Sequence, residues 1–137
     1  MKLYNICYND KYKLDGAENI SISSLDMIPN FSAPSIYISF LNAMSMDQSI
    51  QVIGQLCLKL KVNGILTFRL IDWDQLISYY QNGDLDTNSI CSHMFGTQCL
   101  INRGDIIKMF HKSNEINIDN ITYDNVFCTY TLSRKAL

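Results

Sequence analysis

Two nearly continuous apolar runs, with an amphipathic segment between them, dominate the hydrophobic pattern of the chain. Residues 36–41 and 65–71 are β-prone and lack polar alternation, which is typical of strands that are covered on both faces. Residues 47–60 carry apolar side chains at helical spacing, and Gly64 is expected to end that helix. The segment 35–74 therefore predicts one right-handed βαβ unit, with a ligand crevice at the carboxyl ends of its strands.

The N-terminal part contains two shorter strand candidates, residues 2–8 and 19–25. The polar connection between them is too short for a crossover helix, which needs at least about 10–12 residues. Either that helix has shrunk to a turn, or the two strands are antiparallel. Both prolines then fall in the segment 26–34, which we expect to be a loop.

The C-terminal part predicts two short helices followed by a hairpin. Asp72 and Asn102 are placed to cap the two helices. Two alternating strands follow, and residues 124–125 between them form a two-residue turn that is typical of an antiparallel hairpin. The segment 89–101 carries no readable pattern.

Composition narrows the class of protein. At 137 residues, the chain is expected to form a single domain over residues 1–137. A net charge of −2 means that the chain lacks the excess of basic residues that binding to nucleic acid or to an anionic membrane requires, so neither is expected as a partner. No apolar window approaches the roughly 18 residues of a membrane span, and no cleavable leader is recognisable, so we expect a cytoplasmic protein. Five cysteines without a C-x-x-C pair indicate reduced thiols rather than a zinc site or disulfides.

Three stretches of the sequence resemble the class I S-adenosylmethionine-dependent methyltransferases, in particular a compact branch of that family. Residues 2–22 (KLYNICYNDKYKLDGAENISI) look like its first strand, cofactor turn and second strand. Residues 28–44 (IPNFSAPSIYISFLNAM) look like its loop and fourth strand, and residues 59–76 (KLKVNGILTFRLIDWDQL) like its Lys-Pro-Gly-Gly turn and fifth strand.

The resemblance implies an α/β fold, namely a three-layer methyltransferase-like (Rossmann-like) sheet of about six strands with a parallel centre and a C-terminal antiparallel hairpin. The N-terminal half would be truncated, because the family's third strand and first helix are reduced or missing. S-adenosylmethionine would be the cofactor if the protein is active, and no cofactor is expected otherwise.

The sequence departs from the family at the positions that hold the cofactor. Cys7 and Asn9 stand where family members have glycines that let the backbone approach the methionine part of the cofactor. Ser21 stands where an acidic residue normally binds both ribose hydroxyls, and a hydroxyl gives a weaker bond than a carboxylate. Ala43 and Met44 replace a Glu-His pair.

Three acidic residues match the family's pattern. Asp10 follows the first strand, Asp26 stands where an adenine-facing acid could lie, and Asp72 follows the fifth strand and is the one weak candidate for a catalytic base. Acidic residues at strand ends are also common as helix caps and loop residues, so these three are only weak evidence for a catalytic or cofactor-binding role.

Other candidate sites have plainer explanations. His93 with Cys91 and Cys99 could ligate a metal, but no further ligand accompanies them, and we predict no metal site. Cys99 could also form a nucleophilic pair with His93 or His111, but no family signature surrounds these residues. Trp73, Tyr79 and Tyr80 could line a pocket beside Asp72, although helical spacing favours core packing for Trp73 and Tyr80.

Two hypotheses of different classes remain. The first is a cofactor-less methyltransferase-like protein, or pseudoenzyme, that works as a binding or scaffolding subunit with a protein partner or as a homo-oligomer. The second is an active methyltransferase acting on a small molecule or sugar. The departures at Cys7, Asn9 and Ser21 and the loss of the Glu-His pair favour the first hypothesis. The acids Asp10, Asp26 and Asp72 favour the second.

Overall fold

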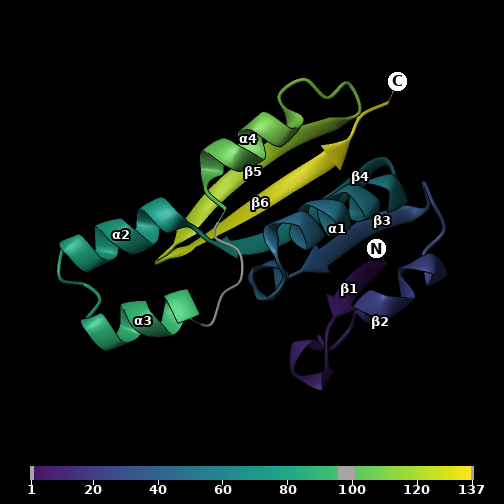
Figure 1. The fold of residues 1–137 in the computed structure, drawn as a ribbon. Helices are drawn as coiled ribbons and strands as arrows, with labels where there is room; N and C mark the ends of the chain where they lie inside the picture. Colours follow the sequence, from purple (N-terminus) through teal and green to yellow (C-terminus); the bar gives the residue numbers. More distant parts are fainter. Residues whose placement is uncertain (1, 96–100, 137) are drawn as a thin grey trace.

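A mixed sheet of six strands forms the centre of the computed structural model, which describes residues 2–95 and 101–136 (Figure 1). The strands lie in the order β2-β1-β3-β4-β6-β5. The first four are parallel, whereas β6 runs antiparallel to both β4 and β5. The strands are β1 (Leu3–Cys7), β2 (Glu18–Ser21), β3 (Ala33–Ile38), β4 (Leu60–Ile71), β5 (Ile116–Asp124) and β6 (Phe127–Arg134).

Helices connect these strands. They are α1 (Met46–Lys59), α2 (Trp73–Gln81), α3 (Thr87–Phe95) and α4 (Arg103–Phe110), together with the short 3-10 helices η1 (Asp10–Tyr12), η2 (Ile22–Met27) and η3 (Leu41–Ala43). Side chains begin the longer helices: Ser45 and Gln48 form a capping box on α1, and Asn102 and Asp105 form another on α4. These caps satisfy amide groups that a helix start leaves without partners.

The direction of each crossover decides which face of the sheet it covers. The connections from β2 to β3 and from β3 to β4 cross the sheet in the same direction, so right-handed crossovers place both on one face. The connection from β1 to β2 runs the other way, which places residues 8–17 on the opposite face. We call these the helix face and the open face.

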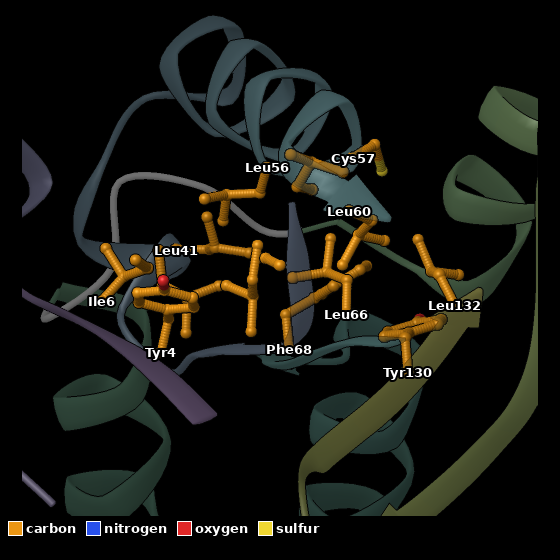
Figure 2. Close-up of a cluster of buried hydrophobic side chains, with 14 of the residues drawn as sticks. Tyr4, Ile6, Leu41, Leu56, Cys57, Leu60, Leu66, Phe68, Tyr130 and Leu132 are labelled. Atoms are coloured by element: carbon orange, nitrogen blue, oxygen red, sulfur yellow. The ribbon is translucent and has the colours of Figure 1, made fainter. Parts of the chain in front are cut away.

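The helix face carries the main core (Figure 2). Leu66 and Phe68, labelled in Figure 2, alternate along β4 with Leu70, and all three are fully buried. They stand opposite buried side chains of β6, and the Phe68 ring stacks on that of Tyr130 at 5.1 Å. Leu56 of α1 and Ile106 of α4 belong to the same cluster, so both helices pack on this face.

The open face is polar instead. Thr67 and Arg69 point to this side of β4, opposite Thr131 and Thr129 of β6, and all four are half-buried. Such alternation is typical of a sheet with one face in water. Of the three layers expected, the one on this face is therefore reduced. Residues 8–17 lie over β1. Helices α2 and α3 pack at the end of β4, where Ile71 and Phe127 belong to their apolar cluster.

The sheet of about six strands expected from the sequence is confirmed, including its parallel centre and its C-terminal antiparallel hairpin. The first connection has indeed shrunk to a turn, since β1 and β2 are parallel and η1 lies between them. The second strand is shorter than predicted, because Ser21 ends it and caps η2.

The expectation that Gly64 ends the first long helix is wrong. Helix α1 ends at Lys59, and the chain continues directly into β4, with Gly64 inside that strand. A Cβ on Gly64 would stand 2.6 Å from the carbonyl oxygen of Ala33, so the glycine is required by close backbone approach and not by a helix end.

Candidate functional site

The carboxyl edge between β1 and β3 is the position where ligands bind in open α/β sheets, because the connections of these two adjacent strands leave in opposite directions. Aromatic rings occupy this edge. The Tyr12 ring lies 5.2 Å from that of Phe40, and the Tyr8 ring lies 6.0 Å from it. Phe40 is buried, whereas Tyr8 is 68% exposed. The edge is thus covered by side chains of the short connection and of the segment after β3.

A polar network centred on the buried Asn5 fixes that connection on the open face. Asn5 is 1% exposed, and its Nδ2 donates to the Tyr12 carbonyl at 2.7 Å and to Asn19 Oδ1 at 2.8 Å. The Asn19 amide in turn accepts from the Leu14 N–H at 2.9 Å and donates to the Leu14 carbonyl at 3.1 Å. Two asparagines thus satisfy backbone groups of residues 8–17 that a helix would otherwise have paired internally.

Cys7 belongs to this network. Asn5 Nδ2 lies 3.3 Å from its sulfur, and the thiol lies 3.6 Å from Asn19 Oδ1. Burial raises the pKa of the Cys7 thiol, which keeps it protonated and unsuited to nucleophilic attack. Sequence reasoning selected Cys7 but missed Asn5 and Asn19. The signal was available, because an asparagine within an otherwise apolar strand needs a buried partner.

Asn9 and Asp10 lie at the start of η1. Asn9 Oδ1 accepts from the Lys11 N–H at 3.0 Å and thereby caps the short helix. The Asp10 carboxylate, 93% exposed, forms an ion pair with Lys13 at 3.0 Å. Both residues lie at the carboxyl edge, and both are engaged in local contacts.

Ser21 and Asp26 stand at the two ends of η2. Ser21 pairs in register with Cys7, as expected for neighbouring strand ends. Its Oγ accepts from the Ser23 N–H at 3.3 Å and lies 2.9 Å from Ser23 Oγ. Asp26 is exposed. Cys7 and Ser21 therefore end neighbouring strands, and Asn9 and Asp10 follow β1. Cys7 is held in the Asn5–Asn19 network, and Ser21 caps η2.

Asp72 lies apart from that group, at the end of β4. It is 2% exposed, and each carboxylate oxygen accepts one backbone N–H: Oδ2 from Gln75 at 3.0 Å and Oδ1 from Arg103 at 3.2 Å. One side chain thus caps α2, as predicted, and also ties down the start of α4. This arrangement leaves the carboxylate buried in a structural role.

A second candidate region lies where α2 and α3 meet the β5–β6 turn. A cavity of about 490 Å³ opens there, and His93 packs edge-on against the ring of Phe127 at 6.2 Å. Arg69 lies over the same ring at 3.8 Å and pairs with Asp124 at 3.5 Å. The cavity is lined by Tyr79, Asp84, Leu85, His93, Asn125, Val126 and Phe127.

The aromatic residues of α2 and the two cysteines singled out in the sequence have different environments. Tyr79, with Trp73, packs in the apolar cluster of α2 and α3, whereas Tyr80 is 44% exposed, so the expectation that Tyr80 packs in a core is wrong. Cys91 is half-buried, and Cys99 lies outside the described residues. Within residues 2–95 and 101–136, no three His, Cys, Asp or Glu side chains are grouped to hold a metal ion.

No protein-family model and no curated protein matches the sequence. Solved structures do match its fold. An O-methyltransferase family protein from Burkholderia thailandensis superposes with a TM-score of 0.62 at 10% identity, over 98% of this chain and 43% of that one. An S-adenosylmethionine-dependent methyltransferase from Mesorhizobium loti gives 0.61 at 10% identity, over 97% of this chain and 90% of that one.

The plantazolicin methyltransferase BpumL, solved in complex with SAH, gives a TM-score of 0.62 at 9% identity, over 98% of this chain and 67% of that one. Among the described residues, no helix combines the length and the apolar character needed to cross a membrane. The superpositions cover nearly the whole of this chain, and they agree with its parallel sheet and C-terminal hairpin in indicating one fold. The chain therefore has the fold of the class I S-adenosylmethionine-dependent methyltransferases.

Proposed function

We propose that this protein is a non-catalytic, methyltransferase-like binding or scaffolding protein that does not take up S-adenosylmethionine. The observation that carries the proposal is the occupied carboxyl edge between β1 and β3. There, the rings of Tyr12 and Phe40 lie 5.2 Å apart, and Phe40 is 4% exposed.

The turn after β1 supports the proposal. In the family that the sequence resembles, glycines here leave room for the cofactor's methionine part, and the backbone itself makes the approach. Here the Cys7 side chain is buried in the Asn5–Asn19 network, and the Asn9 side chain caps η1. Residues 8–17 are held against the sheet by side-chain hydrogen bonds of Asn5 and Asn19, so opening this turn would break those bonds.

The end of β2 supports it as well. A ribose is normally held by a carboxylate that accepts from two hydroxyls, and a charged acceptor makes the stronger bonds. The hydroxyl of Ser21 is engaged with Ser23 in the cap of η2. The residues present at this edge therefore fit the cofactor poorly, both in shape and in hydrogen-bonding capacity.

One observation favours the alternative, an active methyltransferase acting on a small molecule or sugar. Asp10 and Asp26 are both exposed, and a cationic sulfonium cofactor would be attracted to them. The second cavity, lined by Tyr79 and His93 among others, could then receive a substrate.

Isothermal titration of S-adenosylmethionine into the purified protein decides between the two. We expect no heat of binding up to millimolar cofactor, while the plantazolicin methyltransferase BpumL, titrated identically, serves as the positive control. Micromolar binding that Asp26→Ala weakens at least tenfold would sink the proposal and favour the active enzyme.

A further inference from the structure

A small pocket lies at the amino edge of the sheet, at the opposite end of the strands from the edge discussed above. Its volume is about 240 Å³, and it is lined by Phe31, Val62, Arg134 and Lys135. Phe31 precedes β3, Val62 is near the start of β4, and Arg134 ends the antiparallel β6, so three strands meet there.

Arg134 places a fixed positive charge in this pocket. The residue is 7% exposed, and its Nη2 donates to the Cys57 carbonyl at the end of α1 at 2.7 Å. Its Nη1 lies 3.4 Å from the carboxylate of Glu115, which is 57% exposed. Its Nε is buried without a hydrogen-bond partner among the described residues. A buried guanidinium with one long ion pair is incompletely compensated.

Phe31 presents an apolar surface beside that charge. Its φ of 60° lies in the left-handed region, which costs a bulky residue on the order of 1 kcal/mol or more. The strained backbone is held by the bond from the Phe31 N–H to the Leu58 carbonyl at 3.1 Å. The ring is 58% exposed and lies 5.0 Å from the Arg134 guanidinium. Val62, 50% exposed, extends the apolar surface.

Lys135 lines the pocket and adds a second positive charge beside that of Arg134. Glu115 is the acidic side chain that the described contacts place beside Arg134. The pocket thus combines exposed apolar side chains with an excess of positive charge, although the whole chain carries a net charge of −2.

We propose that this amino-edge pocket docks an extended peptide segment of a partner protein in which a carboxylate lies next to an apolar side chain. The apolar side chain would pack on Phe31 and Val62, and the carboxylate would approach Lys135 within the field of Arg134. Charge complementarity selects an acidic rather than a basic segment. A concave pocket with a buried arginine suits a peptide side chain better than the flat surface of a bilayer. The proposal does not depend on whether the carboxyl edge binds a cofactor.

Selection of a random octapeptide display library on the full chain tests this. We expect enriched peptides that contain Asp or Glu next to Leu, Ile, Phe or Met. Synthetic copies should bind at least tenfold more weakly to Phe31→Asn and to Lys135→Glu. Asparagine tolerates a positive φ, so Phe31→Asn removes the ring while keeping the backbone, and its unfolding midpoint should not fall. Tyr80→Gln, which removes an exposed ring from α2, is the matched control and should bind like the unaltered protein.

Three outcomes would overturn the proposal: selection that enriches no peptide, enrichment of basic peptides, or peptides that bind Phe31→Asn as well as the unaltered chain. Sedimentation with phosphatidylserine vesicles supplies the last arm. Vesicle binding that both Phe31→Asn and Lys135→Glu abolish would assign the pocket to a membrane surface and would also overturn it.

Discussion

Tyr130 carries a hydroxyl group that is buried in the main core without a hydrogen-bond partner among the described residues. Its ring is fully buried and stacks on Phe68. Burial raises the pKa of the phenol, and the neighbouring Cys128 thiol, a weak hydrogen-bonding group, raises it further. Leaving such a polar group unpaired costs roughly 1–3 kcal/mol, a cost that phenylalanine would not carry.

We therefore predict that Tyr130→Phe raises the free energy of unfolding by about 1 kcal/mol. The ring contacts remain, and the unpaired hydroxyl disappears. Urea denaturation measures this as a higher midpoint at an unchanged slope. A variant less stable than the original chain would mean that the hydroxyl is bonded to water in solution.

Asp72 gives the contrasting case, because both oxygens of its buried carboxylate accept backbone N–H groups. We predict that Asp72→Ala lowers the free energy of unfolding by about 2–4 kcal/mol, and Asp72→Asn by less, since the amide keeps one acceptor. Asp74→Ala is the control, because Asp74 is exposed in the first turn of α2. Equal effects of Asp72→Ala and Asp74→Ala in thermal unfolding would contradict the bridging role of Asp72.

At the scale of elements, two glycines predict opposite responses to the same change. Gly54 lies in the exposed part of α1, where an added Cβ would meet no atom within 4 Å. Gly54→Ala should therefore stabilise the protein by about 0.5–1 kcal/mol through helix propensity. Gly64→Ala should destabilise it by about 1–3 kcal/mol, because its Cβ would collide with two backbone carbonyl oxygens.

Chemical denaturation of the two variants side by side checks this pair. A stabilising Gly64→Ala would mean that β3 and β4 separate there at little cost. A destabilising Gly54→Ala would mean that α1 approaches another part of the protein in solution.

Much of the element order could be predicted from the sequence, because strong periodicity marks α1, β4 and the β5–β6 hairpin. The caps at Asp72 and Asn102 were also predicted, since capping depends on local residue type. Gly64 was misassigned because a glycine after a helix pattern is usually a C-cap. Nothing local reveals that the backbone of Ala33, from a distant strand, approaches it.

The candidate site was harder to predict, for a related reason. Sequence comparison with the family identified the edge residues Cys7, Asn9 and Ser21, and these do lie at the carboxyl ends of β1 and β2. Cys7 contacts Asn5 and Asn19, whereas Asn9 and Ser21 each cap the short helix that follows them. The position of Cys7 therefore depends on the path of the β1–β2 connection, which the Asn5–Asn19 bond helps to fix. The sequence therefore identifies the residues at such an edge, but it does not reveal the hydrogen bonds that their side chains form.

At the scale of the whole molecule, the fold divides into a large core and a smaller cluster. Helices α2 and α3 pack mainly around Ile71, Leu76, Ile90 and Val126, a cluster separate from the main one. A small apolar cluster provides little resistance to local opening. We predict that amides of α2 and α3 exchange with solvent at least about 100-fold faster than those of β3 and β4.

Hydrogen exchange followed by NMR measures this difference residue by residue. Leu76→Ala should accelerate exchange in α2 and α3 and leave β3 unchanged, whereas Leu66→Ala should accelerate exchange throughout. Uniform exchange rates in the original chain would instead make the molecule one cooperative unit.

The polar open face limits how this chain could be converted into a working enzyme. A longer connection grafted between β1 and β2, bearing a helix, would lie over β1, where Asn5 and Asn19 now bind residues 8–17. The apolar stripe of such a helix would meet amide groups there, so it would gain little by docking. The polar side chains on this face of the sheet would first have to be replaced by apolar ones. Without that change, a grafted loop and helix should remain undocked from the sheet.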